Sequence, residues 1–140
     1  SKSYHLNFSE APPWHAIASK LTGLPVENME RPQVARYKKG NYYKPHFDSV
    51  DPNTDDGKEF VKRGQRIATV LFYLTTATSG GETKFQNLGI SVPPRKGRCL
   101  IFYPGLKDGS VDTRLLHSAE PAVDKKWVCQ IWIRDKRQPY

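Results

Sequence analysis

A chain of 140 residues is long enough to form one domain with its own hydrophobic core, and its aromatic content of 11% argues against intrinsic disorder. The formal net charge of +8 favours anionic partners, but the basic residues are scattered, so a nucleic-acid partner is disfavoured. No apolar run reaches membrane-spanning length and no secretory signal is recognisable, which leaves the compartment and the oligomeric state open.

The first 32 residues are predicted to support a core that extends from about residue 33 to residue 134 of the single domain. Ser1–Phe8 alternates weakly and predicts an edge strand. Ser9 is a candidate N-cap, and Gly23 is a natural end for the helix that follows. His15 is expected on the surface of this helix. Apolar residues recur at helical spacing within it, at Trp14, Ile17, Ala18 and Leu21.

The remainder of the chain reads mainly as short strands. Ser49–Gly64 interrupts them as a long polar segment, which we interpret as a loop of the kind that often serves as a lid. Many short strands with one early helix predict a mainly β fold, a sandwich or barrel with a flanking helix. The predicted strands are Gln33–Tyr37, Tyr42–Asp48, Arg66–Leu74, Glu82–Phe85, Ile90–Val92, Arg98–Tyr103, Leu115–Glu120 and Trp127–Arg134.

The last predicted strand carries two different faces. Side chains alternate along a strand, so Trp127, Cys129, Ile131 and Ile133 share an apolar face that should point into the core. The other face holds Lys126, Val128, Gln130, Trp132 and Arg134. If Lys126 points into a site, Trp132 and Arg134 are expected close to it. Cys99 and Cys129 fit no zinc or redox spacing and are interpreted as buried thiols rather than a disulfide.

His46 and Asp48 are the clearest candidates for chemistry. Two residues apart on an extended segment, they point to the same side and offer a nitrogen and an oxygen ligand to one metal ion. A third ligand would complete the arrangement of two histidines and one carboxylate that holds Fe(II) and leaves positions open. His117, far downstream, is the candidate for that ligand.

Six segments in order resemble the prolyl 4-hydroxylase branch of the iron(II) and 2-oxoglutarate-dependent dioxygenases. They cover the chain from about Gln33 to Arg134, and the resemblance implies a double-stranded β-helix, also called a jelly roll. The segments are QVARYKKGNYYKPHFD, GQRIATVLFYLT, GGETKF, KGRCLIFY, LHSAEPAV and KWVCQIWI.

The resemblance also implies roles for individual residues. His46, Asp48 and His117 match the iron ligands. Residues expected to bind 2-oxoglutarate are Tyr37, Thr83 and Lys126. Residues expected to shape the peptide groove are Tyr43, Arg66, Trp132 and Arg134.

Two departures from the family pattern leave alternatives open. The spacing from His117 to Lys126 is one residue shorter than usual, so Lys125 is kept as a second candidate for the co-substrate cation. Arg134 stands where the family often has histidine, which bears on the preference for peptide.

The resemblance implies a prolyl 4-hydroxylase that uses Fe(II), 2-oxoglutarate and O2, with ascorbate as reductant, and that acts on a proline-containing peptide or protein. One alternative is a related dioxygenase acting on another residue or on a small molecule. Another is a metal-binding jelly roll that serves for interaction without catalysis. Repair of alkylated nucleic acid by the same iron chemistry is suggested only by the net charge of +8.

Overall fold

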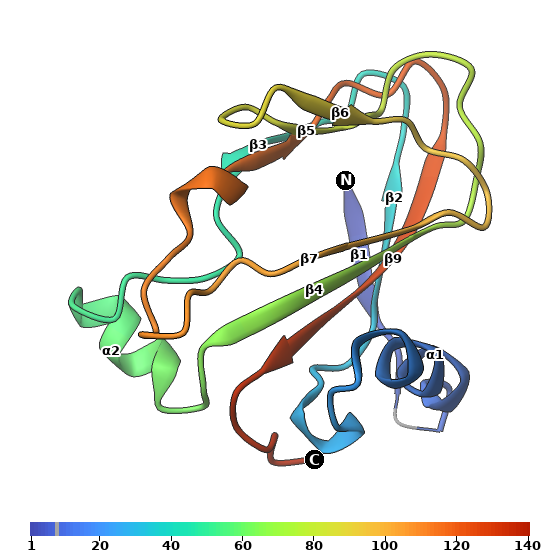
Figure 1. The fold of residues 1–140 in the computed structure, drawn as a ribbon. Coiled ribbons are helices and arrows are strands. Elements are labelled where there is room, and N and C mark those ends of the chain that lie inside the picture. The colour runs from blue at the N-terminus through green and yellow to red at the C-terminus, as the bar shows by residue number, and fades with distance from the viewer. Residues whose placement is uncertain (8) are drawn as a thin grey trace.

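Two antiparallel sheets face each other in the computed structural model, which describes residues 1–7 and 9–140 (Figure 1). The larger sheet has the order β1 (Lys2–His5), β2 (Gln33–Tyr37), β9 (Lys126–Arg134), β4 (Arg66–Tyr73) and β7 (Cys99–Phe102). The smaller sheet has the order β3 (Tyr43–His46), β8 (His117–Ala119), β5 (Thr83–Phe85) and β6 (Ile90–Val92). This arrangement confirms the predicted mainly β, double-stranded β-helix fold, and each predicted strand is present with ends that differ slightly. The described part of the predicted Ser1–Phe8 strand is β1, while Phe8 lies outside the described residues.

The helical elements are α1 (Pro12–Thr22), α2 (Asp55–Val61) and the short 3-10 turns η1 (Val26–Asn28) and η2 (Thr113–Leu115). In Figure 1, α1 covers the outer face of the larger sheet, and α2 lies at one end of the molecule. Among the described residues, no helix has the length and apolar character needed to cross a membrane.

Two predictions about α1 are wrong in detail. The N-cap is Ala11, not Ser9, because Pro12 and Pro13 occupy the first turn, where a missing N–H costs nothing. The helix ends at Gly23 as predicted, with a φ of 72° that favours glycine. His15 is buried rather than on the surface.

The buried face of α1 is rotated relative to the expected one. His15 and Ala18 face inward, three residues apart, while Ile17 and Leu21 stay exposed. The His15 ring is accommodated because its Nε2 lies 3.1 Å from the carbonyl oxygen of Glu30. A satisfied hydrogen bond is what allows a polar ring to be buried at low cost.

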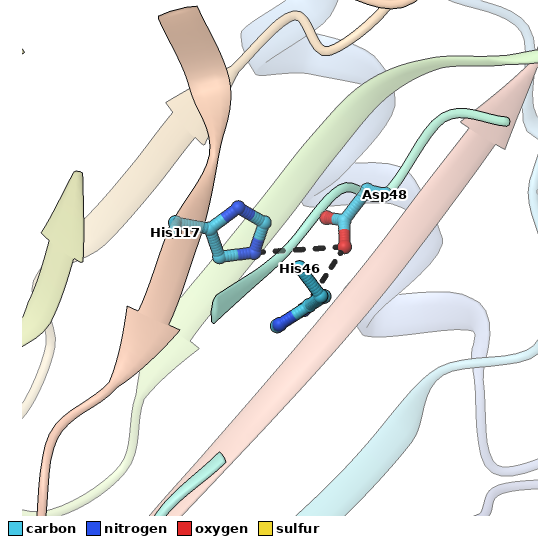
Figure 2. Close-up of side chains that lie close together, drawn as sticks. All are labelled: His46, Asp48 and His117. Carbon is cyan, nitrogen blue, oxygen red and sulfur yellow. Dashed lines mark ion pairs between the residues drawn. The ribbon is translucent and has the colours of Figure 1, made fainter. Parts of the chain in front are cut away.

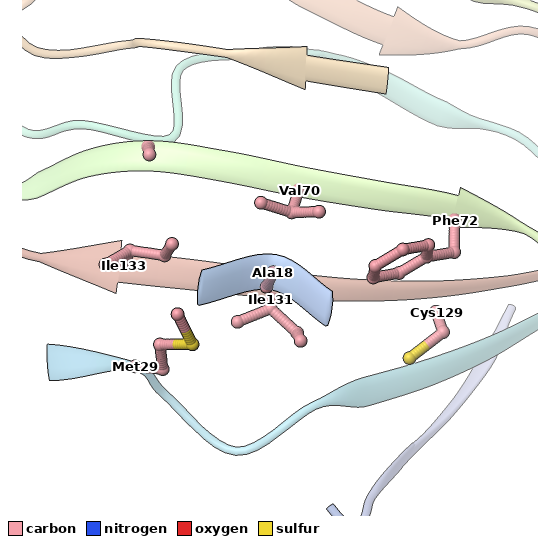
Figure 3. Close-up of a cluster of buried hydrophobic side chains, with 8 residues drawn as sticks. Ala18, Met29, Val70, Phe72, Cys129, Ile131 and Ile133 are labelled. Carbon is pink, nitrogen blue, oxygen red and sulfur yellow. The ribbon is translucent and has the colours of Figure 1, made fainter. Parts of the chain in front are cut away.

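The main core lies between α1 and the larger sheet (Figure 3). The apolar face predicted for the last strand is confirmed for Cys129, Ile131 and Ile133, which are fully buried in this core, whereas Trp127 is half-buried and lies outside it. Truncation of such a side chain, for example Ile131 to alanine, should cost about 2–5 kcal/mol. The other buried members are Ala18, Met29, Ala68, Val70 and Phe72.

Both cysteines are free thiols, as predicted, and Cys129 is fully buried while Cys99 is half-buried. Burial raises the pKa of the Cys129 thiol to about 12. The group is therefore a small apolar core side chain rather than a nucleophile.

The segment predicted as a loop, Ser49–Gly64, contains the helix α2 and the loop prediction is wrong there. Thr54 is its N-cap, and the Thr54 hydroxyl accepts a hydrogen bond from the Gly57 N–H at 3.0 Å. Asp55 and Asp56 stand in the first turn, where negative charge stabilises a helix.

Candidate metal centre and active site

Three ligand atoms converge where β3 ends and β8 begins. His46 is the last residue of β3 and is paired in register with His117, the first residue of β8. Asp48 follows two residues after His46, and its Oδ1 lies 3.4 Å from His46 Nε2 and 3.5 Å from His117 Nε2 (Figure 2). All three ligand atoms lie within 4.8 Å of one another. The predicted convergence of two histidines and one carboxylate is therefore present, and this set of atoms could hold a metal ion.

The backbone fixes both imidazole rings. His46 Nδ1 lies 2.8 Å from the Lys44 carbonyl oxygen, and His117 Nδ1 lies 2.9 Å from that of Leu115. A carbonyl can only accept, so Nδ1 carries the proton and donates in each ring. The lone pair of each Nε2 is then directed at the point that Asp48 also faces, as metal coordination requires.

Asp48 is held as a carboxylate in a nearly dry position. It is only 4% exposed, and its Oδ2 accepts a hydrogen bond from the Thr69 hydroxyl at 2.7 Å. Burial by itself raises the pKa of Asp48, but the hydrogen bond with His46, the charge of His117 and the Thr69 hydroxyl outweigh it and bring the pKa to about 2. Asp48 therefore keeps its negative charge, and its Oδ1 faces the two imidazole nitrogens where a cation could bind.

The two histidines differ in their protonation. Burial lowers the pKa of His117, and this effect exceeds the attraction of Asp48. Burial also lowers the pKa of His46, but its hydrogen bonds with Asp48 and the Lys44 carbonyl outweigh burial and leave the pKa raised. A metal ion binds the neutral ring, so a proton on His46 competes with the cation.

A cavity of about 470 Å³ opens between the sheets beside the triad. Its size is typical of a site for a small organic molecule. Inward-facing residues of both sheets form its wall, including most of the residues predicted for the site. Those residues are Tyr37, Tyr43, His46, Asp48, Arg66, Thr83, His117, Lys126 and Trp132.

A buried ammonium group lies at one end of this cavity. Lys126 is 2% exposed, and its Nζ donates to the Gly81 carbonyl oxygen at 2.8 Å and lies 4.4 Å from the centre of the Tyr37 ring. Burial lowers the pKa of Lys126 to about 8, although the charge of Glu82 opposes this shift. In the described part of the chain, Lys126 forms no ion pair with a carboxylate, so the cation lacks its natural partner. Lys125 is exposed and does not line the cavity.

Hydroxyl groups lie in the same wall. The Thr83 hydroxyl is 2.6 Å from the Tyr73 hydroxyl, and both residues are buried. Burial raises the pKa of Tyr73 to about 12, more than its bond with Thr83 lowers it, so Tyr73 keeps its proton. Sequence reasoning missed Tyr73 and Thr69, because β4 reads as one continuous apolar run. Alternation along β4 would have placed both on the cavity side.

Arg66 and Trp132 form a platform at the other end of the cavity. The Arg66 guanidinium lies 4.0 Å above the centre of the Trp132 ring. Its Nε and one terminal nitrogen donate to the two carboxylate oxygens of Glu30 at 2.8 and 2.9 Å. Tyr43, the first residue of β3, is 48% exposed, and its ring centre lies 4.4 Å from that of His46.

The structure corrects the expected placement of Arg134, which does not line the cavity. Its Nε donates to Glu30 at 2.7 Å, and its terminal nitrogen donates to the carbonyl oxygens of Phe60 and Gly64 at 3.2 and 2.8 Å. A β-bulge between Arg66 and Ala68 interrupts the register of β4 with β9 at this point. The side chain is 6% exposed, and these bonds use its Nε and one of its two terminal nitrogens.

Glu30, which holds Arg66 and Arg134, is a third residue that sequence reasoning missed. Burial raises its pKa, but the bonds and charges of Arg66 and Arg134 outweigh burial and leave the pKa below 4.5. No local pattern marks this residue, because its two partners lie 36 and 104 positions away.

Comparison with known proteins places this geometry in context. Residues 32–134 match the family model described as the 2OG-Fe(II) oxygenase superfamily. Prolyl 4-hydroxylase subunit alpha-1 of Gallus gallus is 38% identical over 144 residues, covering 100% of this chain and 28% of that protein. The Homo sapiens subunit alpha-1 is 39% identical over 121 residues, covering 86% of this chain and 23% of that protein. The chain thus spans about a quarter of the length of these relatives.

Solved structures show the same fold. A viral collagen prolyl hydroxylase from Paramecium Bursaria Chlorella virus-1, in complex with 2OG, matches with a TM-score of 0.78 and 29% identity, covering 96% of this chain and 79% of that chain. A Pseudomonas putida prolyl-4-hydroxylase matches with a TM-score of 0.61 and 22% identity, covering 96% and 72% of the two chains.

Proposed function

The chain belongs to the 2OG-Fe(II) oxygenase superfamily, and from this premise we propose that it hydroxylates proline residues in a peptide or protein. It is a homologue of the prolyl 4-hydroxylase catalytic domain with the iron-binding triad intact. The family and the triad imply Fe(II) as cofactor and 2-oxoglutarate as co-substrate. One observation carries the proposal: a complete triad lies beside a cavity with an unpaired buried ammonium at its far end.

The donor set fits Fe(II). His46, Asp48 and His117 would hold the ion through two imidazole nitrogens and one carboxylate oxygen, which leaves one side for other ligands. The chemistry supplied by Fe(II) at such a centre is O2 activation coupled to conversion of 2-oxoglutarate into succinate and CO2. The Thr69 hydroxyl and the two backbone carbonyls orient the ligands, so their geometry exists before the metal binds.

Lys126 is proposed to bind the distal carboxylate of 2-oxoglutarate. A compact ammonium with one of its three donors used can still donate two hydrogen bonds to a carboxylate. Thr83 and Tyr37 are proposed to contribute hydroxyl groups beside it, and Tyr73 holds the Thr83 hydroxyl in place. The exposure of Lys125 argues against that residue as the alternative cation.

The peptide is proposed to enter over Tyr43, Arg66 and Trp132. Proline-rich segments are extended before binding, so they lose little conformational entropy, and flat aromatic surfaces suit them. The Arg66 and Trp132 platform offers such a surface, and Glu30 neutralises its positive charge. Arg134 supports this platform through Glu30 and is not proposed to contact the peptide.

Succinate formation tests the function. Iron-loaded protein with 2-oxoglutarate under air should form succinate faster with a proline-rich peptide than without it, and the peptide should gain one oxygen atom on proline. His46→Ala should abolish both signals, whereas the matched variant His5→Ala, at an exposed histidine of β1, should retain them. Slow turnover that no proline peptide stimulates would transfer the assignment to a related dioxygenase with another substrate. Absence of turnover in metal-binding protein would favour a non-catalytic interaction module.

A further inference from the structure

A pair of glutamine side chains faces the cavity from neighbouring strands. Gln33 on β2 and Gln130 on β9 stand directly opposite each other in register, and both line the cavity. Gln130 Nε2 donates to Gln33 Oε1 at 2.8 Å. Both residues are half-buried, so this amide pair is accessible from the cavity while its geometry is fixed by the mutual hydrogen bond.

Strand register locates the amide pair between the two ends of the cavity. Along β2 and β9, Lys126 pairs with Tyr37, and Gln130 pairs with Gln33 four residues further on. Four residues of strand span about 13 Å, which separates the amide pair from the proposed carboxylate end.

The amide pair lies close to the metal centre and to the platform. Trp132 pairs with Thr69, the residue whose hydroxyl holds Asp48, and Gln130 pairs with Leu71, the next inward-facing position of β4. One such two-residue step is about 7 Å along a strand. The amide pair therefore borders the region where the proposed peptide would lie over Trp132.

The amide pair has unused hydrogen-bonding capacity of one definite kind. Each side-chain amide has two N–H donors and one carbonyl acceptor, and the mutual bond uses a donor of Gln130 and the acceptor of Gln33. Among the described residues, Gln33 Nε2 and the Gln130 carbonyl oxygen have no other hydrogen bond to protein. The amide pair therefore offers one free donor and one free acceptor, and exchanging the two amide orientations leaves the same combination.

A free donor and a free acceptor are complementary to one residue of an extended chain, because the N–H and C=O of the same residue point to the same side, whereas those of a single trans peptide unit point in opposite directions. We propose that the amide pair binds the main-chain N–H and C=O of one substrate residue next to the target proline; this inference rests on the proposed function. Proline has no N–H, so the residue that the amide pair binds is not itself proline. The site thus selects proline flanked by a non-proline residue over an uninterrupted run of prolines.

Peptides that differ by one methyl group test this inference. A substrate peptide is compared with versions N-methylated at the residue before or after the target proline. For the wild-type protein, one of the two methylations should raise KM about three- to ten-fold, the change expected for one lost hydrogen bond. The Gln130→Met variant should have a KM for the unmethylated peptide that is higher by a similar factor. In this variant, N-methylation of the same peptide residue should not raise KM further.

Equilibrium binding provides a readout that does not depend on turnover. The Kd of a fluorescein-labelled peptide, measured by anisotropy without O2, should change in parallel with KM. The KM for 2-oxoglutarate should stay unchanged. Gln33→Met should weaken binding of the unmethylated peptide in the same way, which keeps the test available if Gln130→Met does not fold. Gln86→Met is the matched control, because Gln86 contacts Ser118 and does not line the cavity.

The outcomes are distinguishable from failure of the proposed function. If the wild-type protein hydroxylates proline but the methylation effect persists in Gln130→Met, the inference is overturned and the function stands. A variant that raises only the KM for 2-oxoglutarate would assign the amide pair to the co-substrate and overturn the inference as well. If no proline peptide stimulates or binds the wild-type protein, the proposed function fails and the inference fails with it.

Discussion

Replacement of Thr69 by valine should weaken metal binding without altering the shape of the site. Valine has nearly the same volume as threonine, so the fully buried position stays filled. What disappears is the 2.7 Å hydrogen bond from the Thr69 hydroxyl to Asp48 Oδ2. The carboxylate keeps its ligand oxygen Oδ1 but loses the group that orients it.

The size of the effect follows from the bond that is lost. A hydrogen bond to a charged acceptor contributes about 1.5–3 kcal/mol. Tenfold in affinity corresponds to about 1.4 kcal/mol, so the metal Kd should rise about 10- to 100-fold. The same loss raises the pKa of Asp48 above its value of about 2, so a proton competes better with the cation at acidic pH.

Anaerobic calorimetric titration with Fe(II) or Mn(II) measures the change directly. The matched control is Thr75→Val, where the hydroxyl accepts from the Trp127 N–H at 3.0 Å and does not line the cavity. Thr75→Val should lower stability but leave the metal Kd unchanged. A Thr69→Val protein whose metal Kd lies within about two-fold of wild type would refute the assigned role of the hydroxyl.

Further predictions concern the cations of the site. Lys126→Met should raise the KM for 2-oxoglutarate more than about 30-fold, because the loss of one partner of a buried charge pair costs about 2–5 kcal/mol. Arg134→Met should lower the free energy of unfolding by about 2–3 kcal/mol in urea titrations, because it removes hydrogen bonds to Glu30, Phe60 and Gly64. The pKa of Glu30 is lowered in the folded state, so its stabilising contribution is present above the ordinary pKa of a glutamate carboxyl and is lost as the pH falls through the lowered pKa of the folded state. Urea titrations at several pH values should show this loss, and Glu30→Gln should reduce it.

Each of these predictions has a control in the chain. Lys125→Met removes an exposed neighbour of Lys126 and should leave the KM for 2-oxoglutarate unchanged. Lys136→Met removes an exposed cation two residues after Arg134 and should cost little stability. An unchanged KM in Lys126→Met, wild-type stability in Arg134→Met or an unaltered pH profile in Glu30→Gln would contradict the corresponding argument.

The strands were predictable because their signal is local. Alternation along β9 assigned its apolar face to the core and placed Trp132 on the same face as Lys126, whose position at the site was implied by the family resemblance. The two-residue spacing of His46 and Asp48 predicted that both side chains reach one side, and they do, although Asp48 lies in a bend beyond the end of β3.

The missed features depend on signals that are weak or distant. The α2 helix is seven residues long and mostly polar, and only Thr54 with the acidic first turn marks its start. Glu30 could not be found from the sequence pattern, because its role is to accept hydrogen bonds from Arg66 and Arg134, which are far away in the chain. Arg134 is the last residue of β9, opposite the bulge in β4, and its side chain binds Glu30 and the Phe60 carbonyl of α2, contacts that the alternation of β9 does not reveal.

The hydrogen bonds that orient the two histidine rings come from main-chain carbonyls two residues upstream, at Lys44 and Leu115. A side-chain substitution cannot delete a carbonyl, so the tautomer of each ring is protected from most point mutations. Lys44 and Leu115 can therefore change identity during evolution at little cost to the imidazoles. Because these two main-chain hydrogen bonds orient the imidazole rings, the surrounding surface can diversify toward new peptides while the metal chemistry stays fixed.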